Sequence, residues 1–180
     1  NISGRSMTYL EHCHYRSVDG VVIACVNFYD PQVVELVNSD VPVVTIDHVF
    51  NNRMAVLSDN VAGLKALVKQ AWACGHRRIA FIHGEKTSVT ENRIAGFYQA
   101  CEELGLEIPE EYVRDGVYHD VERCAEETRA LLALPQRPTC IIFPDDFSAL
   151  GGYNALAEAG LSIPDDISVC LLYTSPSPRD

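Results

Sequence analysis

An arginine in the segment HGEKTSVTENRIAGF, residues 83–97, stands where a helix usually disfavours a cation. Ser88 and Glu91 have the spacing of a capping box, which predicts a helix that begins near Val89. Arg93 then lies in the first turns, where the helix dipole repels positive charge. It also begins a stripe whose other members are apolar and should face inward, namely Phe97, Ala100, Cys101 and Leu104.

A guanidinium at the head of such a stripe has a covered stem and a fixed fork of donors. This fork suits the hydroxyl pairs of a sugar, a carboxylate or a phosphate. The sequence therefore predicts that Arg93 binds a small polar ligand, with a salt bridge between two loops as the structural alternative.

Other polar side chains directly follow short apolar runs. Asp47 follows VPVVTI and could accept two hydroxyls, although it could also cap a loop or helix. Tyr118 follows the short run 112–116 and could stack on a flat ligand or sugar ring, or be an ordinary half-buried aromatic. Asp145 and Asp146 could hold a cation, but one of them is placed to cap the next helix, and no metal site is expected.

These side chains need a scaffold, and the sequence alternates apolar runs with helical patterns. The runs are rich in β-branched residues and lack a period of two, which is typical of parallel strands covered on both faces. They occupy residues 18–26, 41–47, 77–84, 137–143 and 166–172. The prediction is an α/β fold with doubly wound parallel sheets, whose ligands sit beyond the carboxyl ends of the strands.

Several kinds of chemistry have no motif in this chain. There is no Gly-Lys-Ser/Thr phosphate loop, no Gly-x-Gly-x-x-Gly after a strand and no Gly-x-Ser-x-Gly elbow. His12 and His14 flank Cys13 in an expected helix, where positions two apart do not face each other, so a metal role is disfavoured. We therefore expect no enzyme, cofactor or metal.

The composition of the chain predicts how it relates to nucleic acid, to the redox state of its surroundings and to membranes. The net charge is −11, from 14 Lys and Arg against 25 Asp and Glu, so this segment alone should bind nucleic acid poorly. The chain has seven scattered cysteines, mostly in apolar runs, which favours reduced thiols in the cytoplasm. No apolar run is long enough to cross a membrane.

The segments VDGVVIA, VPVVTID, GHRRIAFIHG, ENRIAGFYQACEELGLEIP and RPTCIIFPDDFSALGGYNALAEAGLSIPDDISV occur in this order between residues 17 and 169. Together they resemble the LacI/GalR family of transcription regulators. In that family a helix-turn-helix domain binds operator DNA, and a two-lobed domain of the type I periplasmic-binding-protein fold binds the effector and dimerises. The resemblance implies that Asp47, Thr87, Arg93, Tyr118 and Asp145 bind the effector. Val89 departs from the polar residue common at its position.

The resemblance also implies an incomplete domain. Residues 1–48 would be part of the N-terminal lobe and residues 49–169 the C-terminal lobe. Residues 170–180, CLLYTSPSPRD, depart from the Gly-(Tyr/Phe)-Asp segment of the family and are expected to be a non-native tail.

The leading hypothesis is the effector-binding and dimerisation fragment of a cytoplasmic repressor that senses a small sugar or a nucleoside-like or purine-like ligand. Operator DNA would be contacted only through a missing helix-turn-helix domain, and the expected assembly is a homodimer. The alternative is a periplasmic sugar-binding protein of an ABC transporter, which shares the fold but lacks the DNA-binding domain.

Overall fold

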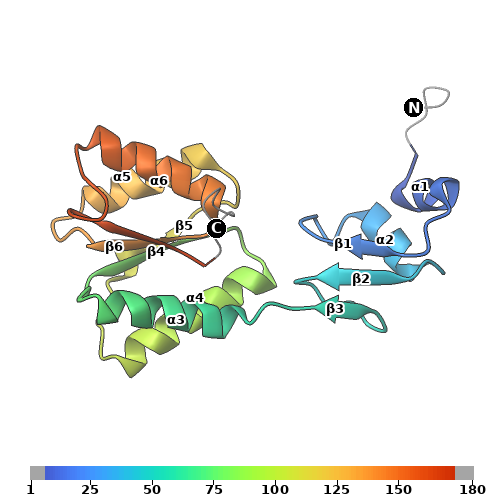
Figure 1. Ribbon diagram of the computed structural model, residues 1–180, viewed down its shortest axis with the longest axis horizontal. Helices are drawn as coiled ribbons and strands as arrows, with labels where there is room; N and C mark the ends of the chain where they lie inside the picture. The colour runs from blue at the N-terminus through green and yellow to red at the C-terminus, as the bar shows by residue number, and fades with distance from the viewer. Residues whose placement is uncertain (1–6, 173–180) are drawn as a thin grey trace, which may run out of the picture. The chain divides into compact units, whose positions relative to one another are not determined.

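The computed structural model describes residues 7–172 and divides into two compact units (Figure 1). The first unit ends at Ser58 and the second begins at Asp59. Among residues 7–172, no helix is long and apolar enough to span a membrane. Each unit has its own sheet, so each is described by itself.

The first unit is a three-stranded parallel sheet with two helices. Its strands, in the order β1-β2-β3, are β1 (Val21–Ile23), β2 (Val43–Ile46) and β3 (Met54–Val56), and its helices are α1 (Tyr9–Arg16) and α2 (Pro31–Asn38). Asp30 caps α2 by accepting a hydrogen bond from the Gln32 N–H at 2.8 Å, and Pro31 occupies the first turn, where its missing N–H costs no helical hydrogen bond. The core contains Ile23, Val33, Leu36, Val37, Val41 and Val43.

The second unit contains a four-stranded parallel sheet in the order β5-β4-β6-β7. The strands are β4 (Ile79–His83), β5 (Val113–Asp115), β6 (Cys140–Phe143) and β7 (Ser168–Leu171), and a short 3-10 turn at Glu110–Tyr112 precedes β5. Helices α3 (Asn60–Ala73) and α4 (Ser88–Glu103) cover one face of the sheet, and α5 (Val121–Leu132) and α6 (Asp146–Glu158) cover the other (Figure 1).

Strand β4 shows why the apolar runs lack a period of two. Ile79 and Phe81 pack into the core beneath α3 and α4, whereas Ala80 and Ile82 pack into the core on the opposite face. All four side chains are buried because helices cover both faces of the strand. The predicted α/β class with parallel sheets is confirmed.

The ends of the helices agree with the sequence at most positions. Gly105 and Gly160 adopt φ values of +65° and +69°, the left-handed conformation that glycine favours directly after a helix, here after α4 and α6. The predicted Ser88–Glu91 capping box is wrong, because Ser88 is already the first helical residue. Thr87 is the N-cap instead: its backbone is extended, and its side chain accepts a hydrogen bond from the Thr90 N–H at 3.2 Å.

The predicted lobes, residues 1–48 and 49–169, stay a prediction, as does the non-native tail at 170–180. Cys170 and Leu171 belong to β7, and residues 173–180 lie outside the described part of the chain. Strand β3 was not anticipated, because its sequence, MAV, is short and its outer residues are exposed.

Candidate functional site

Three loops meet at the carboxyl end of the sheet in the second unit, following β4, β5 and β6. The Tyr118 hydroxyl lies 3.0 Å from the Thr90 hydroxyl, which in turn accepts a hydrogen bond from Thr87 at 3.2 Å. The His119 N–H donates to the Asp145 carboxylate at 2.9 Å. Together with Arg93, these contacts bring four of the five sequence candidates, Thr87, Arg93, Tyr118 and Asp145, to one edge of the sheet.

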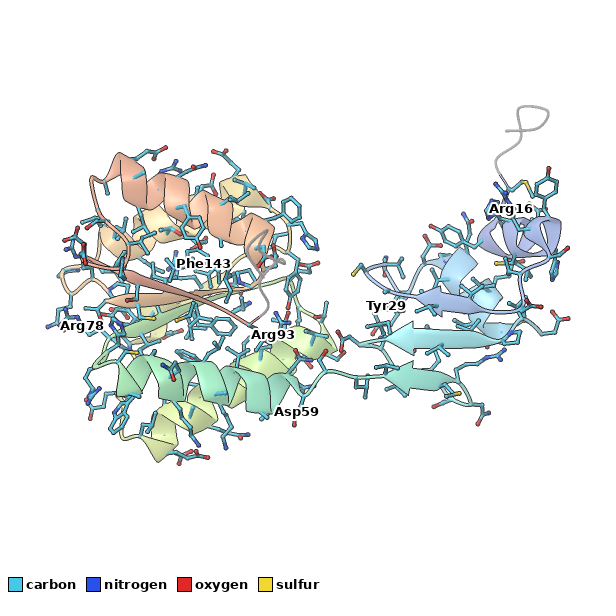
Figure 2. The ribbon with its side chains drawn as sticks, in the orientation of Figure 1. Arg16, Tyr29, Asp59, Arg78, Arg93 and Phe143 are labelled. Atoms are coloured by element: carbon cyan, nitrogen blue, oxygen red, sulfur yellow. The ribbon has the colours of Figure 1, made fainter. Side chains whose placement is uncertain are left out.

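Arg93 is 7% exposed and reaches this edge from the first turns of α4 (Figure 2). Its Nε donates to the side-chain oxygen of Asn60, and its Nη1 donates to the carbonyl of Pro144, both at 2.9 Å. The guanidinium therefore ties α4 to the start of α3 and to the loop before α6. These oxygens offset the dipole cost of a cation at a helix start and hold the fork in one orientation.

The ring of Tyr118 lies 5.7 Å from the guanidinium carbon of Arg93 and directly over Gly84. A Cβ at Gly84 would be 2.2 Å from a ring carbon of Tyr118, so only glycine leaves room for this aromatic. Burial raises the pKa of the Tyr118 phenol, which keeps its hydroxyl protonated and able to donate. The Tyr118 N–H donates to the Glu85 carboxylate at 2.9 Å, which joins the first two loops.

Asp145 lies in the third loop and bonds both to α6 and to the loop after β5. It caps α6 by accepting hydrogen bonds from the Ser148 N–H and hydroxyl, each at 2.9 Å, in addition to the His119 N–H. The capping alternative is therefore confirmed for this residue. Its role as an effector ligand stays a prediction, and an effector hydroxyl would join a carboxylate that already accepts several donors.

Asp47 belongs to the first unit and directly follows β2. Its backbone is left-handed, with φ at +58°, a conformation that Asp tolerates better than most residues. Its Oδ1 accepts a hydrogen bond from the Ser58 N–H at 2.8 Å, so the carboxylate closes a loop within this unit. Its predicted effector contact is not tested by these bonds and stays a prediction.

Two polar residues of the site were missed by sequence reasoning. Thr90 is 1% exposed and links Thr87 to Tyr118, and Asn60 is 4% exposed and binds Arg93. Asn60 is the first residue of α3, and no local pattern in the sequence indicates that it binds Arg93. Thr90 lies three positions after Thr87, so only the assignment of Thr87 as the N-cap would have indicated it. Within residues 7–172, no group of three or more His, Cys, Asp or Glu side chains could hold a metal ion.

Comparison with known proteins places this geometry in a family. Residues 68–178 match the periplasmic binding protein-like domain. The HTH-type transcriptional repressor PurR of Mannheimia succiniciproducens is 32% identical over 165 residues, covering 89% of this chain and 49% of the relative. The ribose operon repressor of Haemophilus influenzae is 29% identical over 163 residues, covering 89% of this chain and 48% of the relative. The chain thus spans about half the length of these curated relatives.

Solved structures agree with the sequence relatives. A regulatory protein of the LacI family from Chloroflexus aggregans is 30% identical, with a TM-score of 0.75, and covers 89% of this chain and 59% of that one. Transcription regulator CcpA of Lactococcus lactis is 25% identical, with a TM-score of 0.76, and covers 90% of this chain and 60% of that one. The chain belongs to the periplasmic binding protein-like domain family, in the form that LacI-family transcription regulators carry.

Proposed function

We propose that this chain is the effector-binding and dimerisation part of a cytoplasmic LacI-type repressor. The observation that carries the proposal is the meeting of Arg93, Tyr118 and Asp145 beyond the carboxyl ends of parallel strands, where ligands bind in such sheets. The relatives are repressors, which supports a regulator over the sugar-binding protein of a transporter. Operator DNA would be contacted by a helix-turn-helix segment outside these residues.

The effector is a small sugar or a nucleoside. A guanidinium fork, a carboxylate and a phenol hydroxyl can bind the hydroxyl groups of a sugar, and the face of Tyr118 can stack on a sugar ring or a base. The name of one relative, a ribose operon repressor, makes a pentose the first probe. Effector binding would favour one arrangement of the regulator over another and thereby change its affinity for operator DNA.

Titration of the intact protein with D-ribose and with adenosine tests this function. We expect at least one of them to bind and to raise the melting temperature, because a ligand that binds only the folded state stabilises it. The same ligand should change operator affinity in a parallel DNA-binding measurement. Absence of binding by both compounds in calorimetry would contradict the proposed effector class.

Dimerisation would use the outer face of α6. Phe147, Leu150 and Tyr153 are 59%, 48% and 38% exposed, and their spacing places them on one side of that helix. Leu150→Asp should convert a dimer to monomers in sedimentation velocity, because a dimer interface of this kind would bury the introduced charge. Tyr98→Asp, at an exposed aromatic of α4, is the matched control and should leave the mass unchanged. A monomeric parent protein would contradict this part of the proposal.

A further inference from the structure

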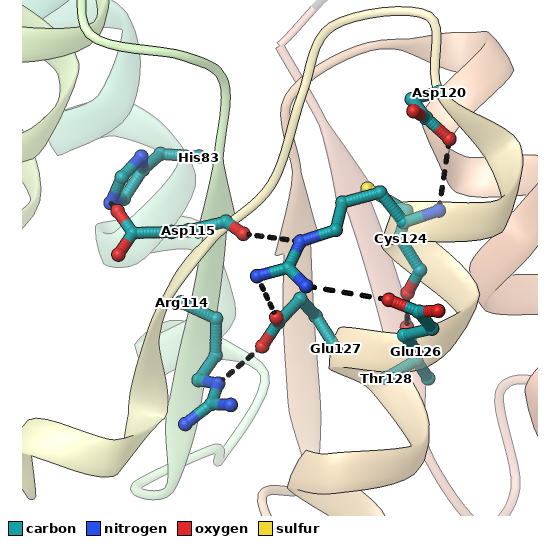
Figure 3. Close-up of polar contacts among 9 residues, drawn as sticks. His83, Arg114, Asp115, Asp120, Cys124, Glu126, Glu127 and Thr128 are labelled. Atoms are coloured by element: carbon teal, nitrogen blue, oxygen red, sulfur yellow. Dashed lines mark hydrogen bonds and ion pairs between the residues drawn. The ribbon is translucent and has the colours of Figure 1, made fainter.

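Both ends of the loop that carries Tyr118 contact a single residue, Arg123 in the first turn of α5. At the start of the loop, the Nε of Arg123 donates to the carbonyl of Asp115 at 3.2 Å (Figure 3). At its end, the Asp120 carboxylate accepts a hydrogen bond from the Arg123 N–H at 2.9 Å. The five residues from Gly116 to Asp120 thus lie between two bonds to one residue. The Arg123 side chain bonds the residue just before them, and the Arg123 backbone bonds the last of them.

The guanidinium of Arg123 is itself held in place by acidic residues of α5. Its Nη2 lies 2.5 Å from Glu127, and its Nη1 lies 3.3 Å from Glu126. The side chain of Glu127 is 6% exposed and also accepts a hydrogen bond from Arg114 of β5 at 2.6 Å. Because a buried carboxylate shared by two guanidiniums cannot move without losing its partners, it fixes the direction in which Arg123 points (Figure 3).

The opposite side of the loop start is attached to β4. The Gly116 N–H donates to the carbonyl of His83 at 2.8 Å, and the Nε2 of His83 lies 3.2 Å from the Asp115 carboxylate. Because β5 is an edge strand, the Asp115 carbonyl has no further strand to bond on its outer side, and Arg123 takes that place.

We propose that Arg123 is a positioning residue for the effector site: its guanidinium fastens the start of the Tyr118 loop, its backbone N–H fastens the end, and the loop is thereby held with Tyr118 against Thr90 and Arg93. The expected effect of Arg123 on effector binding rests on the proposed function. Glu127 is its anchor. Removal of the guanidinium frees the Asp115 carbonyl and so loosens the start of the loop, while the bonds from the Tyr118 and His119 N–H groups to Glu85 and Asp145 have to hold those two residues without that support.

Hydrogen exchange of the intact protein without ligand tests this role. In Arg123→Met, which keeps the helix and the aliphatic stem, exchange of the Tyr118 and His119 amides should rise about tenfold, the effect of one lost charge-assisted hydrogen bond. Arg129→Met is the matched control, because Arg129 lies on the same helix and forms an exposed ion pair with Glu158 at 2.9 Å. It should leave both amides unchanged.

Each outcome decides the proposal. Equal exchange of the Tyr118 and His119 amides in the two variants overturns it. So does a rise spread evenly over α5 and β6, because that pattern is general destabilisation. If Arg123→Met fails to fold, Arg123→Lys keeps a charge for Glu127 and should show a smaller rise at the same two amides. If the parent binds neither D-ribose nor adenosine, the proposed function fails, while exchange still decides the role of Arg123.

Discussion

Arg93→Ala should lower the free energy of unfolding by about 3–5 kcal/mol, because two hydrogen bonds from a buried cation are lost together. The variant leaves the Asn60 side-chain oxygen and the Pro144 carbonyl without the donors that now satisfy them. It also removes the side chain that joins α4 to the start of α3 and to the loop before α6. Urea denaturation of the intact protein, followed by circular dichroism, measures the change.

Arg129→Ala is the control for this loss. Arg129 likewise donates two hydrogen bonds, both to Glu158, but this ion pair is exposed, so we expect a cost of about 0.2–1 kcal/mol. A similar small effect for Arg93→Ala would show that the buried contacts of this guanidinium do not stabilise the unit.

The effect of Arg93 on binding is separated from its effect on folding by Arg93→Lys. Lysine keeps the positive charge and a long stem but has no planar fork, so it cannot replace both hydrogen bonds and still present a fixed donor to a ligand. At a temperature where the variant is folded, calorimetry should show the affinity for the bound effector reduced by about tenfold or more, the effect of one lost charge-assisted hydrogen bond. Operator binding in the absence of effector should stay close to that of the parent. Unchanged affinity would remove Arg93 from the effector site.

The sequence was sufficient for the scaffold because its signals were local and repeated. The continuous apolar runs predicted the strands β1, β2, β4, β6 and β7, of which β4 and β6 are almost wholly buried, whereas Val22 of β1 is 67% exposed. Asp30 and Gly160 are local signals of a helix start and a helix end, and the structure confirms both ends. Strand β3 has no such signal, since only three residues pair with β2 and two of them face solvent. Pairing of this kind depends on the neighbouring strand rather than on the strand's own residues.

The site was predictable in position but not in its bonding. Polar residues after parallel strands converge wherever the sheet brings the strand ends together, so Tyr118 and Asp145 could be placed from their spacing. The partners of Arg93 could not, because Asn60 and Pro144 are 33 and 51 residues away along the chain. Likewise, no local pattern distinguishes an Asp145 that caps a helix from one that also orders a neighbouring loop through His119.

Gly151→Ala should be the most damaging small substitution on the opposite face of the sheet. A Cβ at Gly151 would lie 1.9 Å from the carbonyl oxygen of Val121 and 2.9 Å from the amide nitrogen of Ala125, so the backbones of α5 and α6 would have to separate. Alanine gains about 1 kcal/mol of helix propensity over glycine, but overpacking against backbone costs about 1–3 kcal/mol or more. Because the clash is with backbone atoms, we expect a cost at the upper end of this range, about 3 kcal/mol, and so a net loss of about 2 kcal/mol in urea denaturation.

Asn154→Ala on the same helix separates the two effects. Asn154 is exposed, so alanine there gains helix propensity without a new contact, and stability should rise by up to about 0.7 kcal/mol.

The close contact between α5 and α6 at Gly151 also bears on the site, because Val121 directly follows the Tyr118 loop and α6 begins beside Asp145. Separation of the two helices should therefore lengthen the bond from the His119 N–H to Asp145 and raise exchange of that amide. If Gly151→Ala were as stable as the parent with the His119 amide still protected, the glycine would not be setting the distance between the two loops.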